Sequence, residues 1–282
     1  MKKIFLALSF VFIFSLSVFA YEPEIKENRA YFPPVIMYHD IKIEAHDKFD
    51  VLLEDFCAQL DWLKENNYKT LSMEEFVSII KKGKPFPEKS VLLTFDDGYS
   101  GIANYAVTEL KKREMKGTFF IITDMLGVFS TRYVHTTEKQ LKEIANNKLF
   151  SIGSHTLSHP HLLELNEDDL EDEIEDSKEF LEKLTGRKVL AFAYPYGEFD
   201  DDIVKRVIDA GYEAAFAVQN GQLCDYPARY TIPRIYMGLE LCKNNQELFK
   251  KYVQDYKNMP PEAFEERFEP LPVDAHFFEK KN

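Results

Sequence analysis

Two short clusters in this 282-residue chain combine residue types that carry out hydrolytic chemistry. The first is the Asp-Asp-Gly sequence at residues 96–98, which directly follows the apolar run 91–95. The second holds His155, His159 and His161, among only seven histidines in the whole chain. Two imidazoles and one carboxylate form the ligand set of a hydrolytic zinc site, which leaves a fourth position open for water. Asp-Gly also occurs in ordinary turns, so the hypothesis requires the two clusters to meet in space.

The elements that carry these clusters are predicted to be buried strands. The continuous apolar run at 91–95 ends in a turn signal, as does a similar run at 190–193 before a Pro-Tyr-Gly sequence. Strands and helices alternate along residues 35–237, which predicts a parallel sheet with helices outside it. Seven to eight such units favour a barrel over an open sheet. The carboxyl ends of its strands would then bring the clusters to one rim.

Three motifs, taken in order, resemble the signature sequences of the polysaccharide deacetylases, the NodB-homology domain of carbohydrate esterase family 4. They are Thr94-Phe-Asp-Asp-Gly98, His155-Thr-Leu-Ser-His159 and Tyr194-Pro-Tyr-Gly197. The resemblance covers about residues 35–237 and implies an α/β fold, a distorted (β/α) barrel of seven to eight strands. The Tyr-His-Asp-Ile sequence at 38–41 is similar to the poly-N-acetylglucosamine deacetylase branch.

The resemblance also implies a role for individual residues. A divalent metal, most typically Zn²⁺, would be held by Asp97, His155 and His159. Asp96 would be the general base and His39 the general acid, although a hydrogen-bonded loop residue is the other interpretation of His39. The third motif would stabilise the oxyanion through the backbone N–H of Tyr196, and its other members would contact substrate: Tyr194, Pro195 and Gly197.

One position departs from the family pattern. Many members have an arginine just before the Pro-Tyr-Gly motif, where it pairs with the base, but this chain has Ala191-Phe-Ala-Tyr194 there. Arg234 is the candidate to supply that charge from another strand. A purely structural ion pair is the alternative interpretation of Arg234.

The implied activity is hydrolysis of N-acetyl groups on an amino-sugar polysaccharide, such as poly-N-acetylglucosamine, peptidoglycan or a chitin-like polymer, with release of acetate. The alternatives are an O-acetyl esterase on xylan-type glycans and a non-catalytic carbohydrate-binding protein of the same fold. A net charge of −13 argues against nucleic acid and anionic lipid surfaces as partners. The sequence leaves the oligomeric state open.

The chain divides into four segments. Residues 1–20 combine two lysines, a long apolar run and a final small residue, Ala20, as in a secretory signal peptide. This predicts a secreted or cell-envelope protein without stable membrane insertion after cleavage, while an uncleaved anchor is the alternative. A flexible leader (21–34), the catalytic domain (35–240) and a terminal helix with an acidic tail (241–282) follow. Pairing of Cys224 with Cys242 is left open.

Overall fold

The computed structural model describes residues 32–130, 133–218, 227–238 and 246–256. The predicted signal peptide, both Cys224 and Cys242, and the acidic tail beyond residue 256 lie outside these ranges, so the assignments made for them remain predictions. Within the described ranges, no helix has the length and apolar character needed to cross a bilayer.

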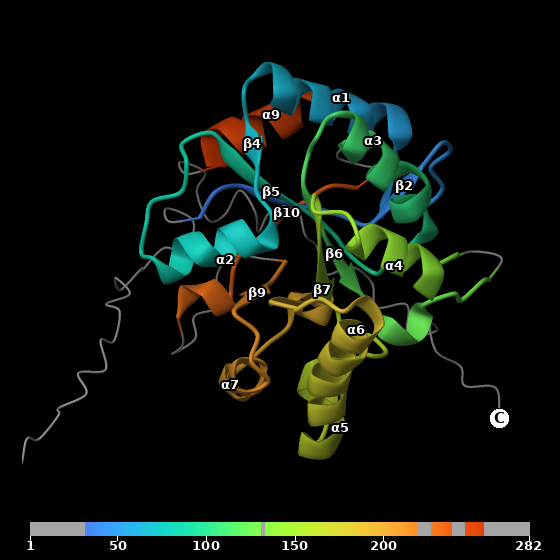
Figure 1. Cartoon of the computed structure of the whole chain (residues 1–282), viewed down its shortest axis with the longest axis vertical. Helices are drawn as coiled ribbons and strands as arrows, with labels where there is room; N and C mark the ends of the chain where they lie inside the picture. The colour runs from blue at the N-terminus through green and yellow to red at the C-terminus, as the bar shows by residue number, and fades with distance from the viewer. Residues whose placement is uncertain (1–31, 131–132, 219–226, 239–245, 257–282) are drawn as a thin grey trace, which may run out of the picture.

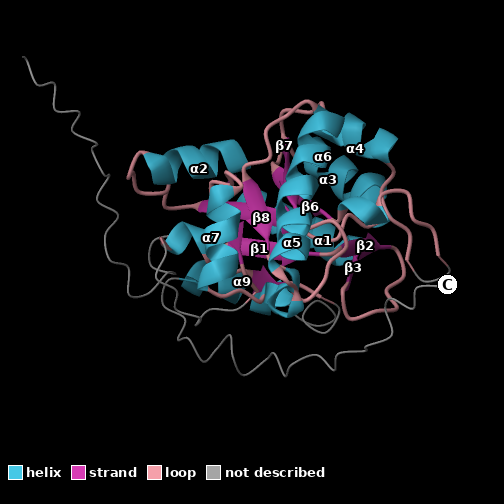
Figure 2. Cartoon of the chain, turned by 90° about the horizontal axis from the view of Figure 1, so that it is seen from below, coloured by secondary structure: helices cyan, strands magenta, loops and turns pink. Residues whose placement is uncertain are grey.

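A parallel sheet forms the centre of the molecule, and helices surround it (Figures 1 and 2). Its strands lie in the order β10-β1-β5-β6-β7-β8-β9, and β4 also pairs with β5. The strands of this sheet are β1 (Val35–Tyr38), β4 (Lys69–Thr70), β5 (Ser90–Phe95), β6 (Gly117–Ile121), β7 (Phe150–Ser154), β8 (Ala191–Ala193), β9 (Ala214–Phe216) and β10 (Ile235–Tyr236). A separate parallel pair joins β2 (Asp40–Lys42) to β3 (Asp50–Leu52).

The backbone of Ile232 links the two edges of the sheet through hydrogen bonds. The N–H of Ile232 donates to the carbonyl of Ala215 at 3.0 Å, and the N–H of Ala217 donates to the carbonyl of Ile232 at 2.9 Å. The chain then continues into β10, which pairs with β1. The sheet therefore curls into a half-barrel, and the predicted distorted (β/α) barrel is confirmed.

The helices begin and end at signals that are visible in the sequence. Ser72 and Thr137 each form a capping box with the residue three positions later, and Gly186 ends a helix with a φ of 68°. The helices are α1 (Leu53–Glu65), α2 (Met73–Lys81), α3 (Val107–Lys112), α4 (Glu138–Ala145), α5 (Glu167–Glu171), α6 (Ser177–Thr185), α7 (Asp201–Asp209) and α9 (Gln246–Asp255). Two π-helical segments, η2 (Ile102–Ala106) and η5 (Asp172–Asp176), precede α3 and α6.

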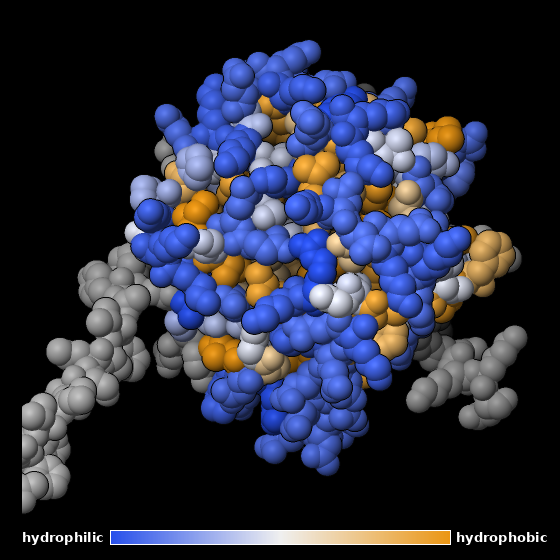
Figure 3. Space-filling model, in the orientation of Figure 1, coloured by the Kyte–Doolittle hydropathy of each residue, from blue (hydrophilic) through white to orange (hydrophobic). Residues whose placement is uncertain are grey.

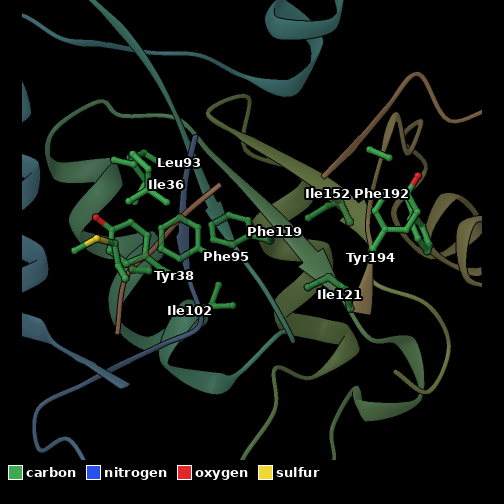
Figure 4. Close-up of a cluster of buried hydrophobic side chains, with 14 of the residues drawn as sticks. Ile36, Tyr38, Leu93, Phe95, Ile102, Phe119, Ile121, Ile152, Phe192 and Tyr194 are labelled. Carbon is green, nitrogen blue, oxygen red and sulfur yellow. The ribbon is translucent and has the colours of Figure 1, made fainter. Parts of the chain in front are cut away.

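Alternation along each strand separates two apolar layers. In β5, Leu93 and Phe95 belong to the layer between the sheet and its outer helices, where the rings of Phe95 and Phe119 lie 5.0 Å apart (Figure 4). Leu92 belongs instead to an inner cluster with Phe76 of α2. Because successive side chains leave a strand in opposite directions, Asp96 is in phase with Leu92 and lies on the inner face. The strand pattern thus aims the first acid into the barrel.

Two segments differ from what their sequence patterns predict. The apolar residues of 50–66 recur at helical spacing, but the helix starts at Leu53, because residues 50–52 pair with β2 instead. Residues 230–237 read as one strand, but only β10 forms, since Pro233 has no N–H to donate to a ladder. The acidic segment capped by Asn166 is helical through α5, η5 and α6, as its sequence predicts, and η5 adds a π-helical turn within it.

Candidate active site

The two acids after β5 point in different directions because the chain turns at once. The N–H of Asp96 donates to the carbonyl of Tyr38 at 2.9 Å, which continues the pairing with β1. Asp97 has a φ of 66° and Gly98 a φ of 73°, and the Gly98 N–H returns to the Asp96 carbonyl at 2.8 Å. A left-handed aspartate is uncommon and needs a surrounding structure that holds it. This turn brings the Asp97 carboxylate toward His155.

The two histidines come from the end of β7 and the loop after it. One ring nitrogen of His155, Nδ1, lies 2.8 Å from the carbonyl of Ala193, so Nε2 faces Asp97 Oδ1 at 3.4 Å. Nε2 of His159 lies 3.8 Å from the same oxygen. A carbonyl on one ring nitrogen fixes the orientation of an imidazole and leaves the other nitrogen free to bind a metal. The second and third motifs therefore meet the first at one point.

These three side chains fit a metal ion. One ligand atom from each of Asp97, His155 and His159 lies within 4.8 Å of the others. Oδ1 of Asp97 is buried and has no hydrogen-bond partner among the described residues. A buried carboxylate oxygen without a donor is costly unless a cation satisfies it, and two imidazoles complete a usual zinc ligand set.

The titratable groups of the cluster shift one another's pKa values. Burial opposes ionisation of Asp97, but the imidazole of His155, whose Nε2 lies 3.4 Å from Oδ1, and the neighbouring imidazoles of His39 and His159 hold its pKa well below its usual range. Burial and the positive charge of His155 lower the pKa of His159 to about 4, and Asp97 offsets this only in part. For His155, burial lowers the pKa, yet the two neighbouring carboxylates outweigh burial and raise it. An imidazole binds a metal only through an unprotonated nitrogen, so metal affinity at this cluster should rise with pH.

Asp96 is paired with Arg234 in the core of the barrel. The guanidinium donates from Nη1 to Oδ1 and from Nη2 to Oδ2 of Asp96, both at 2.7 Å. Asp96 is 1% exposed and Arg234 is fully buried. Nε of Arg234 donates to the carbonyl of Ala217 at 3.0 Å, and the guanidinium lies 5.5 Å from the ring centre of Phe120. A planar bidentate pair of this kind is directional as well as strong.

His39 lies at the end of β1 between two aromatic rings. Its ring centre is 5.0 Å from that of Phe49 and 5.6 Å from that of Tyr236. The Tyr236 hydroxyl donates to the carbonyl of Lys48, the residue before Phe49, at 2.7 Å. This bond links the two aromatic residues that flank His39. Burial lowers the pKa of His39 more than the carboxylates of Asp96 and Asp97 raise it. Nδ1 of His39 is buried without a partner in the described part of the chain.

Tyr196 is the exposed member of the third motif. It has a φ of 58°, and its side chain is 47% exposed. The His161 ring stacks on it at 4.0 Å with an interplanar angle of 10°, and the His159 ring meets it edge-on at 4.6 Å. Nδ1 of His161 lies 2.9 Å from Oε2 of Glu198. Tyr196 is thus held against a predicted metal ligand by a stacked imidazole.

The structure places Tyr194 and Pro195, which the sequence analysis assigns as substrate contacts, in the core. Tyr194 is fully buried, and its hydroxyl donates to the carbonyl of Tyr230 at 3.0 Å. Pro195 is buried as well. Both side chains support the motif from inside the core. Gly197 is required for packing, because a Cβ there would lie 2.8 Å from the backbone nitrogen of Val218.

Two further residues at the site were missed by the sequence analysis. The rings of Tyr99 and His135 lie 4.8 Å apart, and the two residues form an isolated antiparallel bridge. Burial and the charge of Asp97 raise the pKa of Tyr99, while burial lowers the pKa of His135 against the effect of Asp97. No local pattern marks His135, because only the pairing of its segment with the loop after Asp97 brings it here.

Comparison with known proteins assigns the family. Residues 83–215 match the sequence profile of the polysaccharide deacetylases. A poly-beta-1,6-N-acetyl-D-glucosamine N-deacetylase of Staphylococcus epidermidis is 32% identical over 196 residues, which cover 66% of this chain and 68% of that protein. The chain belongs to the polysaccharide deacetylase family.

Solved structures agree with this assignment. The Streptococcus pyogenes deacetylase PplD, determined in complex with acetate, superposes with a TM-score of 0.66 at 27% identity over 84% of this deacetylase and 98% of PplD. A polysaccharide deacetylase of Bacillus cereus, BC0361, superposes with a TM-score of 0.67 at 29% identity, covering 78% of this chain and 68% of the other. The residues described above therefore lie in the fold of an enzyme that deacetylates polysaccharides.

Proposed function

We propose that this deacetylase is a metal-dependent N-deacetylase that acts on an amino-sugar polymer of the poly-N-acetylglucosamine type and releases acetate. The observation that carries the proposal is the meeting of Asp97, His155 and His159 beside the buried Asp96–Arg234 pair. The named activity of the staphylococcal relative and the acetate bound to PplD support the same chemistry.

The metal and the base have separate tasks in this proposal. A divalent cation held by Asp97, His155 and His159 would supply Lewis-acid polarisation of the acetyl carbonyl and would acidify water. Asp96 accepts the proton of the attacking water. Each Asp96 oxygen accepts one hydrogen bond from Arg234. A carboxylate oxygen has about two acceptor positions, so each oxygen has a second one available for the proton of water. The two bonds from Arg234 hold the Asp96 carboxylate in one orientation.

The acid and the oxyanion donor complete the set. The protonated form of His39 donates to the amine nitrogen as the carbon–nitrogen bond breaks, because an unprotonated amine is a poor leaving group. The backbone N–H of Tyr196, in its left-handed conformation, donates to the oxygen that becomes negatively charged in the transition state.

A panel of acetylated glycans tests the proposed function. We expect acetate release from poly-N-acetylglucosamine to exceed release from chitin oligomers, peptidoglycan and acetylxylan. Preferential release from acetylxylan would identify an O-acetyl esterase instead. Binding of glycans without acetate release from any of them, by protein loaded with Zn²⁺, Co²⁺ or Mn²⁺, would identify a binding protein.

Replacing a predicted metal ligand should remove the metal. We expect His155→Ala to lose stoichiometric Zn²⁺ binding, since the imidazole fixed by the Ala193 carbonyl is gone. Elemental analysis after dialysis measures the metal content. His46→Ala is the matched control, because the His46 side chain is 76% exposed and is not one of the predicted metal ligands. Full metal content in His155→Ala would show that the ligand set is wrong.

Removing the proposed acid should separate two kinds of substrate. We expect His39→Ala to lower N-deacetylation by about 10²–10⁴-fold, the usual contribution of a general acid, and to change hydrolysis of an aryl acetate far less. An aryl alcohol leaves without protonation, whereas an amine does not. Acetate release from both substrates, with metal content measured in parallel, checks this. Equal losses on both substrates would mean that His39 maintains the site, and no loss on either would assign the acid role to another residue.

A further inference from the structure

The loop between the two predicted metal-binding histidines has an unusual backbone. Thr156 has a φ of 70° and His159 a φ of 64°, both in the left-handed region. The β-branched Thr156 is costly there and needs neighbouring groups to hold it. Within the loop, the His159 N–H donates to Oγ1 of Thr156 at 2.9 Å. This one internal bond leaves the intervening Leu157 and Ser158 to be fixed from outside.

Glu173 fixes them. Its Oε2 accepts from the N–H of Leu157 at 2.8 Å and from the N–H of Ser158 at 2.9 Å. Its Oε1 accepts from the hydroxyl of Ser158 at 2.6 Å. All three bonds are made to an ionised carboxylate, and charge-assisted bonds of this kind are shorter and stronger than neutral ones. One side chain therefore satisfies every donor that the middle of the loop presents.

The opposite side of the loop is held independently. The N–H of Asp124 donates to the carbonyl of Leu157 at 2.9 Å, and the N–H of Thr123 donates to the carbonyl of Thr156 at 3.2 Å. The carbonyls of the loop therefore rest on the segment after β6, and its N–H groups rest on Glu173. Loss of Glu173 would free only the second side.

Glu173 itself is placed by the π-helical turn η5. The neighbouring Ile174 is buried, and its carbonyl accepts from the Tyr212 hydroxyl at 2.9 Å and from the Ser177 hydroxyl at 3.1 Å. The hydroxyls of Ser177 and Ser154 lie 2.8 Å apart, and Ser154 directly precedes His155. π-Helical turns often occur at functional sites. η5 therefore contacts the loop before the second histidine, and Ser177, the residue that follows η5, contacts the chain before the first.

Glu173 belongs to a strongly acidic arm, most of whose acidic side chains are exposed to solvent. α5, η5 and α6 form the lower projection in Figure 1, and the same region is almost uniformly hydrophilic in Figure 3. Glu173 is partly buried and turned to the loop. Its three hydrogen bonds to Leu157 and Ser158 distinguish it from the exposed acidic residues of the arm.

We infer that Glu173 is a positioning residue that sets His159 at the distance from His155 and Asp97 that a metal ion requires. The inference rests on the metal role in the proposed function. The partners that orient metal ligands affect metal affinity nearly as directly as the ligands do, with losses of about 10–100-fold when they are replaced. A helix–loop contact that serves only stability would leave the affinity of the folded protein unchanged.

Zn²⁺ affinity measured on the full chain tests the inference. The protein is stripped with a chelator and titrated with Zn²⁺ against a chromophoric competitor, and the Co²⁺ absorption spectrum reports the ligand geometry. We expect Glu173→Gln to raise the Kd for Zn²⁺ by about 10–100-fold and to alter the Co²⁺ spectrum. The amide retains one acceptor oxygen, so Glu173→Gln should remain folded.

Two further variants make the result decisive. Asn166→Ala removes the side chain that accepts from the Asp169 N–H at the start of α5, so it weakens the same arm without touching the loop. We expect this control to lower the Tm but to leave the Kd unchanged. Ser158→Ala removes one of the three bonds and should raise the Kd less than Glu173→Gln does. Ser158→Ala also replaces Glu173→Gln as the deciding variant if the latter does not fold.

The outcomes separate this inference from the proposed function. An unchanged Kd in folded Glu173→Gln, or in Ser158→Ala if that variant decides, would overturn the positioning role. An equal rise in Asn166→Ala would overturn it too, because a general loss of stability would then explain the effect. If wild-type protein binds no Zn²⁺, or if His155→Ala binds it as tightly, the proposed metal site fails first.

Discussion

Replacing Asp96 by asparagine is expected to lower acetate release by about 10²–10⁴-fold, the usual contribution of a general base. An amide cannot take the proton of water, yet it has nearly the shape of the carboxylate. Asp96 is not among the three predicted metal ligands, so the metal content should stay at the wild-type level. Steady-state rates and elemental analysis of the same preparation check both parts.

A second acid-to-amide change provides the control for Asp96→Asn. Asp124 follows the neighbouring strand β6 and is exposed, and Asp124→Asn should leave turnover near the wild-type rate. Near-normal turnover by Asp96→Asn would place the base at another residue. Loss of metal together with turnover would instead mean that Asp96 maintains the metal site.

Replacing Arg234 by methionine is expected to destabilise the protein by about 3–5 kcal/mol, the usual cost of leaving one partner of a buried ion pair alone. Asp96 is 1% exposed and has both oxygens bound to Arg234, so the variant buries an uncompensated carboxylate. Urea denaturation at neutral pH measures the free energy of unfolding. Combining Arg234→Met with Asp96→Asn should recover part of the loss, because the two residues are directly coupled.

A surface pair provides the comparison for Arg234→Met. Arg206 also pairs with an acidic residue, Glu171, but the Glu171 side chain is 53% exposed. Arg206→Met should therefore cost only about 1 kcal/mol or less in unfolding free energy. Arg234→Lys keeps the charge but not the bidentate geometry, and we expect intermediate stability. A loss in Arg234→Met no larger than in Arg206→Met would show that the buried pair does not stabilise the fold.

Local sequence was sufficient for several of the elements. Apolar runs ended by turn residues predicted β5 and β8, and Ser72 followed by Glu75 has the pattern of a capping box, which forms at the start of α2. These signals depend on a strand period of two and on side-chain to backbone bonds within a few residues. They work because the forces involved act between neighbours in the chain.

Several features of the site depend on the backbone in ways that residue types do not reveal. Asp96 and Asp97 are adjacent and chemically identical, and a φ of 66° at Asp97 separates an inward acid from one that faces the histidines. Tyr194 belongs to the predicted motif, yet packing places its ring in the core. A motif specifies which residues occur together, whereas the conformation of its turn decides which of them face the cavity.

By itself, the sequence predicted the order of most strands and helices, the family and the three candidate metal ligands, because short, contiguous motifs carry this information. Only the tertiary structure decided the partners that come from distant segments. Arg234 reaches Asp96 because the sheet curls and links its edges through Ile232, and Glu173 reaches the histidine loop because η5 turns one acid of a charged run inward. No periodic pattern in the sequence relates the residues that make such contacts. These contacts therefore form only when the barrel has folded.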